Sequence, residues 1–468
     1  MSERLIGSSP SLYVPGRHQI IGADYLVEHP RCMLVADPGL GKTTTVLLAL
    51  DHLTLLGSNF FPALVLAPKR VADVVWTGEV EKWARFNHLR IVQITGTEQQ
   101  RREILRRPVY DIYVINYELV EWLVGTWTQT QWPFKIVVAD ECSRLKGFRI
   151  QKGRVRAAAL GDIARYTGRW WNLTGTPTPN GLQDLWAQMW FIDFGERLKR
   201  SYTAFKEAFL MEDPYTHRVK IQMGAAEAIH ELVADRLIAF RAEDWLDVSK
   251  PQIIPVPFEL SPKAMVRYRE MERDFFMEID DKQIEAGNAM VKSTKLLQIC
   301  SGSVYDGDTN PHHVHDDRLE ALDSVLEENG GEPVLVSYYW RTDPPRILAH
   351  LKRLGIAARV YGGKQDEDDW NQRKFRVLLL QENCAYGLNL HEPCRDIFHY
   401  SYFWGAEMWT QMIGRVGPTR QKQAGKSCVV RVWVAQAAGT IERGVVDSNL
   451  QKISVEDALK RARAQRKL

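Results

Sequence analysis

A short glycine-rich stretch in this chain has the residue types and spacing that phosphate binding requires. The stretch ADPGLGKTTT, residues 36–45, lies between an apolar run and a helical-looking segment. Gly39 and Gly41 would let the backbone curl around phosphate groups, which the N–H groups of the following helix favour. In this pattern Lys42 reaches the β- and γ-phosphates, and the Thr43 hydroxyl ligates Mg²⁺. The stretch predicts a triphosphate-binding loop, and the alternative is a glycine-rich turn that caps a helix.

A pair of carboxylates, Asp140 and Glu141, follows the apolar run KIVVA further along the chain. An aspartate at a strand tip beside a phosphate-binding loop can hold Mg²⁺ through water. Glu141 would then be placed to orient and deprotonate an attacking water molecule. Acidic residues at strand ends are common, so the pair predicts hydrolysis because the glycine-rich loop precedes it.

The elements that must position these residues are short apolar runs that alternate with helical segments. In the first half the runs are RCMLVAD, FPALVLAP, DIYVINY, KIVVADE and WWNLTGTP. A second series follows, with PVLVSYY, IAARVYGG, RVLLLQEN, DIFHYSY and SCVVRVWVA. Brief apolar runs that stop at Pro, Gly, Asp or Thr are typical of buried parallel strands. We therefore predict an α/β fold with a first lobe over 1–200, a helical bridge over 201–247 and a second lobe over 248–468.

Composition limits the protein class. A chain of 468 residues with 45% hydrophobic and 25% charged residues is ordinary for a globular protein of two domains. We find no apolar run of membrane-spanning length and no N-terminal signal segment. The six cysteines form no CxxC pair, which suits reduced thiols. The net charge of +3 neither indicates nor excludes nucleic-acid binding, because a local basic track would suffice.

Seven segments in order resemble the SWI/SNF-related ATPases of helicase superfamily two, over roughly residues 12 to 455. DECSRLKG resembles the family's DEAH-RIKN box, with Cys142 and Ser143 in place of Ala-His. LTGTPTPNGLQDLW is close to the family's LTGTP-IQN-LEELW motif. The other matches are LVLAPKRVADVVWTGEVEKW, VINYEL, KLLQICSG, GLNL and FWGAEMWTQMIGRVGPTRQ. The resemblance implies two tandem RecA-like lobes with ATP and Mg²⁺ as cofactors, and the compact layout is similar to phage and small prokaryotic members.

The resemblance also implies roles for individual residues in nucleotide binding. Gln19 corresponds to the glutamine that reads adenine, and Ala36 stands where the general loop pattern has Gly, as is common in superfamily two. The TGT segment corresponds to the motif that couples the state of the γ-phosphate to lobe closure. The implied nucleotide-binding residues are Gln19, Gly39, Gly41, Lys42, Thr43 and Thr44, with Thr43 and Asp140 on Mg²⁺ and with Thr174, Gly175 and Thr176 for coupling.

The second lobe is expected to supply an arginine to ATP. Gln411 and Arg415 correspond to the family's glutamine and first arginine finger. The family has a second arginine three residues after the first, where this chain has Pro418, so Arg420 is the alternative. The implied catalytic set is Lys42, Asp140, Glu141, Gln411, Arg415 and Arg420.

A nucleic-acid motor of this kind contacts the phosphate backbone rather than base edges. The implied contacts are Lys69, Arg70, Asn116, Tyr117, Arg144, Lys146 and Asn389. The basic C-terminal segment VEDALKRARAQRKL is expected to be a solvated helix.

Three functions remain open from the sequence. The first is an ATP-dependent translocase on double-stranded DNA, expected to act as a monomer in the cytoplasm of a prokaryotic or phage-infected cell, without a membrane partner. The second is a strand-separating DNA or RNA helicase. The third is a non-hydrolysing nucleic-acid clamp, which Pro418 keeps open.

Overall fold

A computed structural model describes residues 10–452 apart from 108, 128, 150–154, 213–218, 282–285, 307–309, 386 and 427. Contacts divide the chain into two units, with the boundary between Trp245 and Leu246. The basic C-terminal segment predicted as a helix lies outside the described residues. Within the described part, no helix combines the length and the apolar character needed to cross a bilayer.

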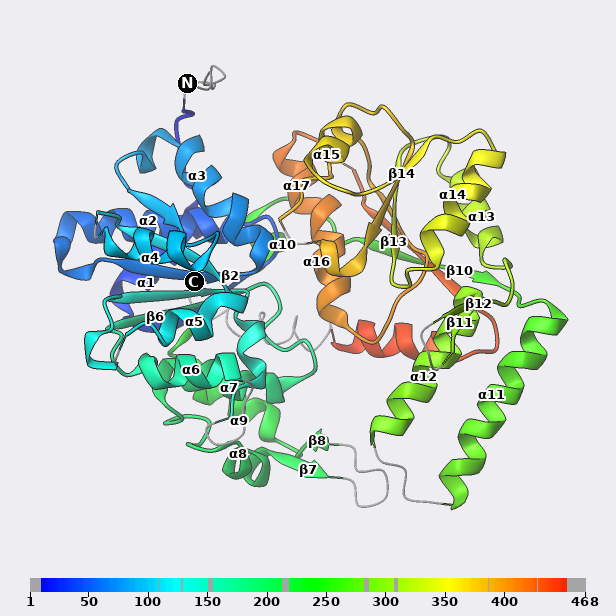
Figure 1. Ribbon diagram of the computed structural model, residues 1–468, viewed down its shortest axis with the longest axis horizontal. Coiled ribbons are helices and arrows are strands. Elements are labelled where there is room, and N and C mark those ends of the chain that lie inside the picture. Colours follow the sequence, from blue (N-terminus) through cyan, green and yellow to red (C-terminus); the bar gives the residue numbers. More distant parts are fainter. Residues whose placement is uncertain are drawn as a thin grey trace. The chain divides into compact units, whose positions relative to one another are not determined.

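The first unit is built on a sheet of seven strands in the order β3-β4-β2-β5-β6-β1-β9. Two of these strands, β2 and β6, are labelled in Figure 1. Every neighbouring pair in this sheet is parallel. The strands are β1 (Arg31–Ala36), β2 (Ala63–Ala67), β3 (Ile91–Gln93), β4 (Ile112–Asn116), β5 (Ile136–Asp140), β6 (Arg169–Thr174) and β9 (Leu237–Phe240). The parallel α/β fold predicted for this half is confirmed, with two strands, β3 and β9, that the sequence reading did not include.

Helices cover both faces of this sheet, because the strands are apolar on both sides. Met33 and Val35 of β1 belong to the core that includes residues of α5 to α9, whereas Leu34 points to the opposite face, close to Gly22 of α1. The helices are α1 (Arg17–Glu28), α2 (Lys42–Leu56), α3 (Trp76–Lys82), α4 (Glu98–Arg106), α5 (Val120–Val124), α6 (Val155–Ala164), α7 (Leu185–Asp193), α8 (Tyr202–Phe209), α9 (Ala225–Leu232) and α10 (Ala242–Trp245).

Residues 201–247, expected as a helical bridge, have a different organisation. They contain α8, a two-stranded hairpin of β7 (Leu210–Glu212) and β8 (Val219–Ile221), α9, β9 and α10. Strand β9 pairs with β1, so this segment completes the first sheet. The run LIAF of β9 is short and follows charged residues, which hides its strand character in the sequence.

The second unit contains a parallel sheet of six strands in the order β10-β17-β16-β13-β15-β14. These strands are β10 (Gln252–Phe258), β13 (Val334–Tyr338), β14 (Ala358–Val360), β15 (Val377–Gln381), β16 (Asp396–His399) and β17 (Arg431–Ala437). A separate hairpin joins β11 (Ser303–Tyr305) to β12 (Pro311–His313). The second α/β lobe is therefore also confirmed.

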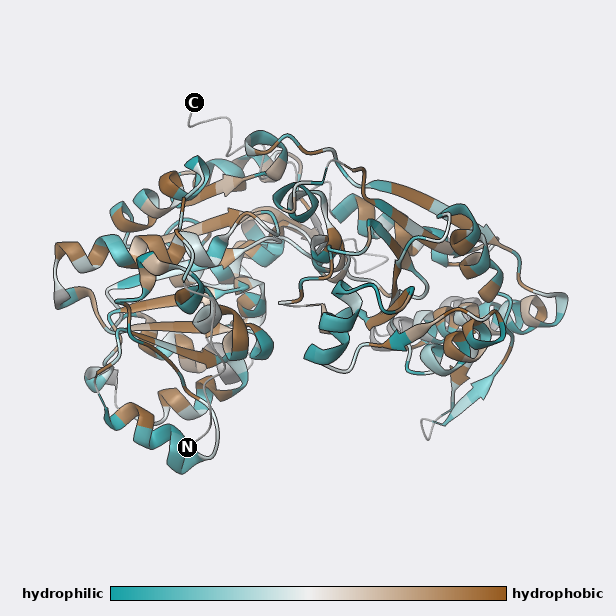
Figure 2. Cartoon of the chain, turned by 90° about the horizontal axis from the view of Figure 1, so that it is seen from above, coloured by the Kyte–Doolittle hydropathy of each residue, from teal (hydrophilic) through white to brown (hydrophobic). Residues whose placement is uncertain are grey.

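The two faces of the second sheet carry different helices. One core includes residues of α11 to α14, and the other includes residues of α15 and α16. Figure 2 shows that most strands are largely hydrophobic while the helices carry both kinds of residue, as expected for a sheet between amphipathic helices. The helices are α11 (Pro262–Asp281), α12 (Ala286–Ser301), α13 (Leu319–Glu328), α14 (Asp343–Arg353), α15 (Lys364–Asn371), α16 (Ala406–Val416) and α17 (Pro418–Gln423).

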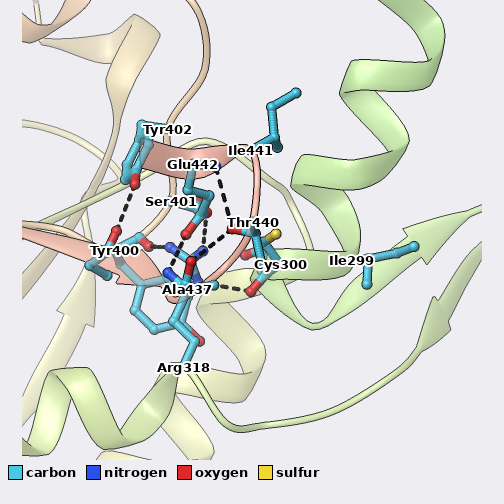
Figure 3. A network of polar contacts seen from close by, with 12 residues as sticks. Ile299, Cys300, Arg318, Tyr400, Ser401, Tyr402, Ala437, Thr440, Ile441 and Glu442 are labelled. Carbon is cyan, nitrogen blue, oxygen red and sulfur yellow. Dashed lines mark hydrogen bonds and ion pairs between the residues drawn. The ribbon is translucent and has the colours of Figure 1, made fainter. Parts of the chain in front are cut away.

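A buried ion pair between Arg318 and Glu442 holds several elements of the second unit together (Figure 3). The Arg318 guanidinium also donates to the carbonyl oxygens of Cys300 and Tyr400. The second carboxylate oxygen of Glu442 accepts the backbone N–H of Ala437 at 2.8 Å. The pair thus links the end of α12 and the start of α13 to the loops that follow β16 and β17.

Candidate active site

The glycine-rich loop joins the end of β1 to the start of α2. Gly39 has φ 89° and Gly41 has φ 76°, left-handed values that favour glycine. Lys42 is the first residue of α2, and its ammonium donates to the carbonyl oxygen of Ala36 at 3.0 Å. The loop therefore folds back over the strand end and brings the lysine to the positive end of a helix, where an anion is favoured.

Gln19 of α1 lies directly against this loop. Its side-chain oxygen accepts the N–H of Gly16 at 2.8 Å, and its Nε2 donates to the Thr44 hydroxyl at 2.9 Å. A Cβ atom added to Gly41 would lie 2.3 Å from the same Nε2. The structure thus brings Gln19 and Thr44 together at the glycine-rich loop, and Gly41 is required there by both its conformation and its surroundings.

Asp140 is the last residue of β5, two strands away from β1 in the sheet, and Glu141 follows it. The buried side chain of Asp140 accepts a hydrogen bond from the indole of Trp76 at 3.0 Å. Burial raises the pKa of the Asp140 carboxyl above its usual range; the neighbouring Glu141 carboxylate raises it further, and the nearby Lys42 ammonium lowers it. Glu141 is also buried and has φ 53°, a left-handed conformation that is uncommon outside glycine and is found at functional sites.

The TGT segment ends β6, which lies between β5 and β1. Thr174 pairs with Val35 of β1, and Leu173 pairs with Asp140 of β5. A Cβ atom added to Gly175 would lie 3.4 Å from the carbonyl oxygen of Ala36 and 3.5 Å from the Lys42 ammonium. Three adjacent parallel strands therefore place the lysine, the acidic pair and the TGT segment together at the carboxyl-terminal ends of the strands.

Thr174 and Thr176 are both fully buried, and the N–H of Thr176 donates to the Thr174 hydroxyl at 3.0 Å. The Gln188 amide of α7 supports the same region by donating to the carbonyl oxygen of Pro177 at 2.6 Å. The thiol of Cys142 donates to the Gln188 side-chain oxygen at 3.0 Å. Gln188 thus connects the segment after β6 to the segment after β5.

Two residues that contact this site were not identified from the sequence. In the sequence, Trp76 after β2 is typical of a core aromatic residue, yet its indole N–H donates a hydrogen bond to the Asp140 carboxylate. Gln188 lies within LWAQMWFID, whose residues otherwise indicate a buried helix. A polar side chain in the middle of that apolar run is the one local signal that could have drawn attention to it.

The residues present fit a magnesium ion. Mg²⁺ takes oxygen ligands and is commonly held by one or two side chains together with substrate phosphates and water. Asp140 and the half-buried Thr43 offer oxygen atoms of this kind beside Lys42. Among the described residues no group of three or more His, Cys, Asp or Glu side chains could hold a metal ion.

In the second unit, Gln411 and Arg415 lie one turn apart on α16 and are both buried. The Arg415 guanidinium donates to the side-chain oxygen of Gln411 at 2.8 Å and to its carbonyl oxygen at 3.0 Å. A third bond of 3.4 Å reaches the carbonyl oxygen of Leu388. The structure therefore brings these two predicted residues together as one hydrogen-bonded group.

Arg420 is positioned differently. The helix α16 ends at Val416, and Pro418 begins the separate helix α17, a position where proline is well tolerated. The half-buried Arg420 donates to the side-chain oxygen of Asn389, an exposed residue in the loop after β15. The structure groups Arg420 with a residue predicted to contact nucleic acid.

The nucleic-acid candidates of the first unit fall into two groups. Lys69 and Arg144 have exposed side chains, while Arg70 and Lys146 are half-buried. Lys69 lies 3.3 Å from Asp73, and Arg144 lies 3.9 Å from Glu118. Contact of these four side chains with a backbone phosphate stays a prediction.

Asn116 and Tyr117 form the second group, and both are buried. The Asn116 side chain accepts the N–H of Leu119 at 3.2 Å and so caps a short helical turn. The Tyr117 hydroxyl donates to the carbonyl oxygen of Asp140 at 2.9 Å. Burial raises the pKa of the Tyr117 phenol well above its usual range. Tyr117 therefore contacts the acidic pair, whereas Asn116 caps the turn that begins with Tyr117.

The two groups of predicted ATP-site residues belong to different units. Lys42, Asp140 and Glu141 belong to the first unit, and Gln411 and Arg415 to the second. Their convergence on one triphosphate stays a prediction.

Comparisons with known proteins bear on both units. A family model described as the SNF2-related domain matches residues 18–302. A phage protein from the Acyrthosiphon pisum secondary endosymbiont phage 1, called putative protein p41, is 37% identical over 454 residues, covering 96% of this chain and 98% of that protein. The ISW2 ATPase of the ISWI chromatin-remodeling complex from Saccharomyces cerevisiae is 28% identical over 500 residues. That match covers 96% of this chain but 41% of the yeast protein.

A solved structure, the SWI2/SNF2 ATPase core of Sulfolobus solfataricus in complex with dsDNA, aligns with 99% of this chain and 96% of its own chain, at 20% identity and a TM-score of 0.45.

Proposed function

Because the chain belongs to the SNF2-related family of ATP hydrolases, we propose that it uses ATP hydrolysis to move along double-stranded DNA. The observation that supports this most is the meeting of Lys42, Asp140 and Gly175 at one edge of the first sheet. Such an edge can bind a triphosphate and hydrolyse it. Similarity to a chromatin-remodelling ATPase over nearly the whole chain supports DNA as the polymer.

Hydrolysis is assigned to residues of the first unit. The loop N–H groups and Lys42 bind the β- and γ-phosphates, and Gln19 contacts the base beside the loop. Thr43 and Asp140 would hold Mg²⁺, which when bound neutralises charge on the phosphate oxygens. Glu141 orients a water molecule and accepts its proton as the water oxygen forms a bond to the γ-phosphorus and the bond to the β-phosphate oxygen breaks.

Arg415 is the residue of the second unit that we assign to the transition state. A guanidinium directed at the γ-phosphate stabilises the negative charge that develops there. Its bonds to Gln411 and Leu388 fix the side chain in one orientation, which reduces the reorganisation needed during the reaction. This assignment requires the two units to close on one nucleotide.

Stimulation of ATP turnover by different polymers tests the proposal. The rate of phosphate release should be measured with saturating duplex DNA, single-stranded DNA and RNA, and the Lys42→Ala variant should be measured beside the wild type. We expect duplex DNA to give the largest increase and the variant to give none. Stimulation by single strands or RNA alone would favour a strand-separating helicase, and turnover insensitive to Lys42→Ala would contradict the assigned site.

A further inference from the structure

The surface where the loop after β15 meets α17 carries a pair of polar side chains from two separate segments. Arg420 of α17 donates a hydrogen bond to the side-chain oxygen of Asn389. Asn389 is exposed and Arg420 is half-buried, so solvent reaches this pair. The pair therefore forms a surface feature of the second unit.

The main chain of Asn389 is fixed by the neighbouring helix α15. Its N–H donates to the carboxylate of Glu367 at 3.2 Å, and its carbonyl oxygen accepts the side-chain amide of Asn371 at 3.1 Å. With the main chain held on both sides, the Asn389 side chain has a defined direction toward Arg420. A preorganised pair loses less entropy on binding a ligand than two mobile side chains would.

Arg420 is separated from Arg415 by a break in the helix. Gly417 has an extended ψ of 167°, and Pro418 starts α17 from there. In a continuous helix, the residues three or four positions after Arg415 would lie on the same helix face as Arg415. The break between α16 and α17 removes this alignment, and Arg420 makes contacts that differ from those of Arg415. Arg415 is buried among Gln411 and Leu388, whereas Arg420 reaches Asn389.

The hydrogen-bond donors of Arg420 and Asn389 favour the binding of an oxyanion. The Asn389 side-chain oxygen, its acceptor, is directed at the guanidinium, so the amide Nδ2 is the group that can donate outward. Guanidinium and amide donors side by side match the oxygens of a phosphate, which accepts several hydrogen bonds at once.

Further cationic side chains lie near the pair, together with acidic ones. Lys426 and Arg420 both lower the pKa of His391, after the larger effect of burial, so both cations lie near that ring. Lys422 lies on α17 and is exposed. The acidic residues near the pair are Glu367, whose carboxylate accepts the Asn389 N–H, Glu392, which is 3.2 Å from Lys426 and 3.4 Å from His391, and Asp247, which is 3.5 Å from Lys422.

We propose that Arg420 and Asn389 together bind one phosphate of the DNA backbone, so that Arg420 is a DNA contact and not a second arginine finger. The inference rests on the proposed function, since it assumes DNA as the polymer. Phosphate chemistry alone would also suit the γ-phosphate of ATP. The exposed partner Asn389 and the basic neighbours favour a polymer that runs along the surface over a single buried nucleotide group.

Duplex binding measured as a function of salt concentration separates the two phosphate sources. In Arg420→Gln we expect about tenfold weaker duplex binding, the loss of one charge-assisted hydrogen bond. The slope of log K against log salt should become less steep by about 0.9, the contribution of one phosphate contact. The kcat for ATP at saturating duplex should fall far less than the about 10³-fold that the loss of an arginine finger would cause.

Three further variants serve as comparisons. Asn389→Ala should weaken binding with the slope unchanged, because the amide is neutral, and Arg420→Lys should restore the slope because it keeps the charge. Arg353→Gln makes the same charge change at an exposed position of α14, on the opposite face of the second sheet, and should leave affinity and slope unchanged.

Two outcomes would overturn the inference while leaving the proposed function intact. One is a fall in kcat of about 10³-fold in Arg420→Gln with normal duplex affinity and slope, which would make Arg420 an arginine finger. The other is wild-type behaviour of Arg420→Gln in every measurement. A wild-type chain that bound no duplex would instead contradict the proposed function itself.

Discussion

At the scale of single residues, the two carboxylates at the end of β5 have different proposed roles, metal binding for Asp140 and water activation for Glu141. Asp140 is held by the Trp76 indole, while Glu141 adopts a left-handed conformation beside it. Glutamine has the same shape as glutamate but does not accept a proton. Glu141→Gln should therefore keep ATP binding and slow turnover about 10²- to 10⁴-fold.

Turnover and nucleotide affinity should be measured together for this variant. Lys42→Ala is the comparison, because it removes the charge directed at the β- and γ-phosphates and should weaken ATP binding as well as turnover. Rapid hydrolysis by Glu141→Gln would exclude Glu141 as the base.

The hydrogen bond from Trp76 to Asp140 gives a second prediction at this scale. Trp76 is fully buried, so Trp76→Phe keeps most of its packing but leaves the Asp140 carboxylate without the indole donor. We expect a loss of about 1–3 kcal/mol in the free energy of unfolding. We also expect a higher Mg²⁺ concentration for half-maximal turnover, because the carboxylate is less well oriented. Urea unfolding and a Mg²⁺ titration check these effects, and an unchanged Mg²⁺ requirement would show that the indole serves packing alone.

At the scale of elements, the Arg318–Glu442 pair joins segments of the second unit that are far apart in sequence. Both side chains are buried, so removing one charge leaves the other uncompensated. Glu442→Gln should lower the free energy of unfolding by about 3–5 kcal/mol. Arg318→Met combined with Glu442→Gln should cost less than the sum of the two single changes. Urea unfolding followed by circular dichroism measures all three variants, and strict additivity would mean that the two charges do not interact.

At the scale of the whole molecule, the sequence predicted both parallel α/β lobes, because their strands are apolar runs that end at turn residues. It also predicted which residues end β1, β5 and β6. That these three strands are neighbours in the sheet could not be predicted, because it depends on pairing between segments far apart in the sequence. For the same reason the sequence did not reveal that the Trp76 indole donates to the Asp140 carboxylate, or that the Tyr117 hydroxyl donates to the Asp140 carbonyl oxygen. Strand β9 was missed because four residues carry too little periodicity, and its pairing with β1 makes residues 201–245 part of the first unit.

Cooperation between the two units is the property on which the motor proposal depends. The first unit contains the phosphate-binding loop and the acidic pair, so ATP binding should depend mainly on that unit. If Arg415 of the second unit acts on the transition state, Arg415→Ala should lower kcat by about 10³-fold or more at saturating DNA. The affinity for ATP should change much less, because the arginine acts where charge develops during the reaction.

The buried position of Arg415 requires a control for local damage to α16. Gln411→Ala removes the side-chain partner of Arg415 but keeps the guanidinium, so it should reduce kcat less than Arg415→Ala does. Circular dichroism should show that both variants remain folded. Equal and complete loss in both would indicate disruption of α16, whereas near-normal turnover of folded Arg415→Ala would mean that the second unit does not supply this arginine to the nucleotide.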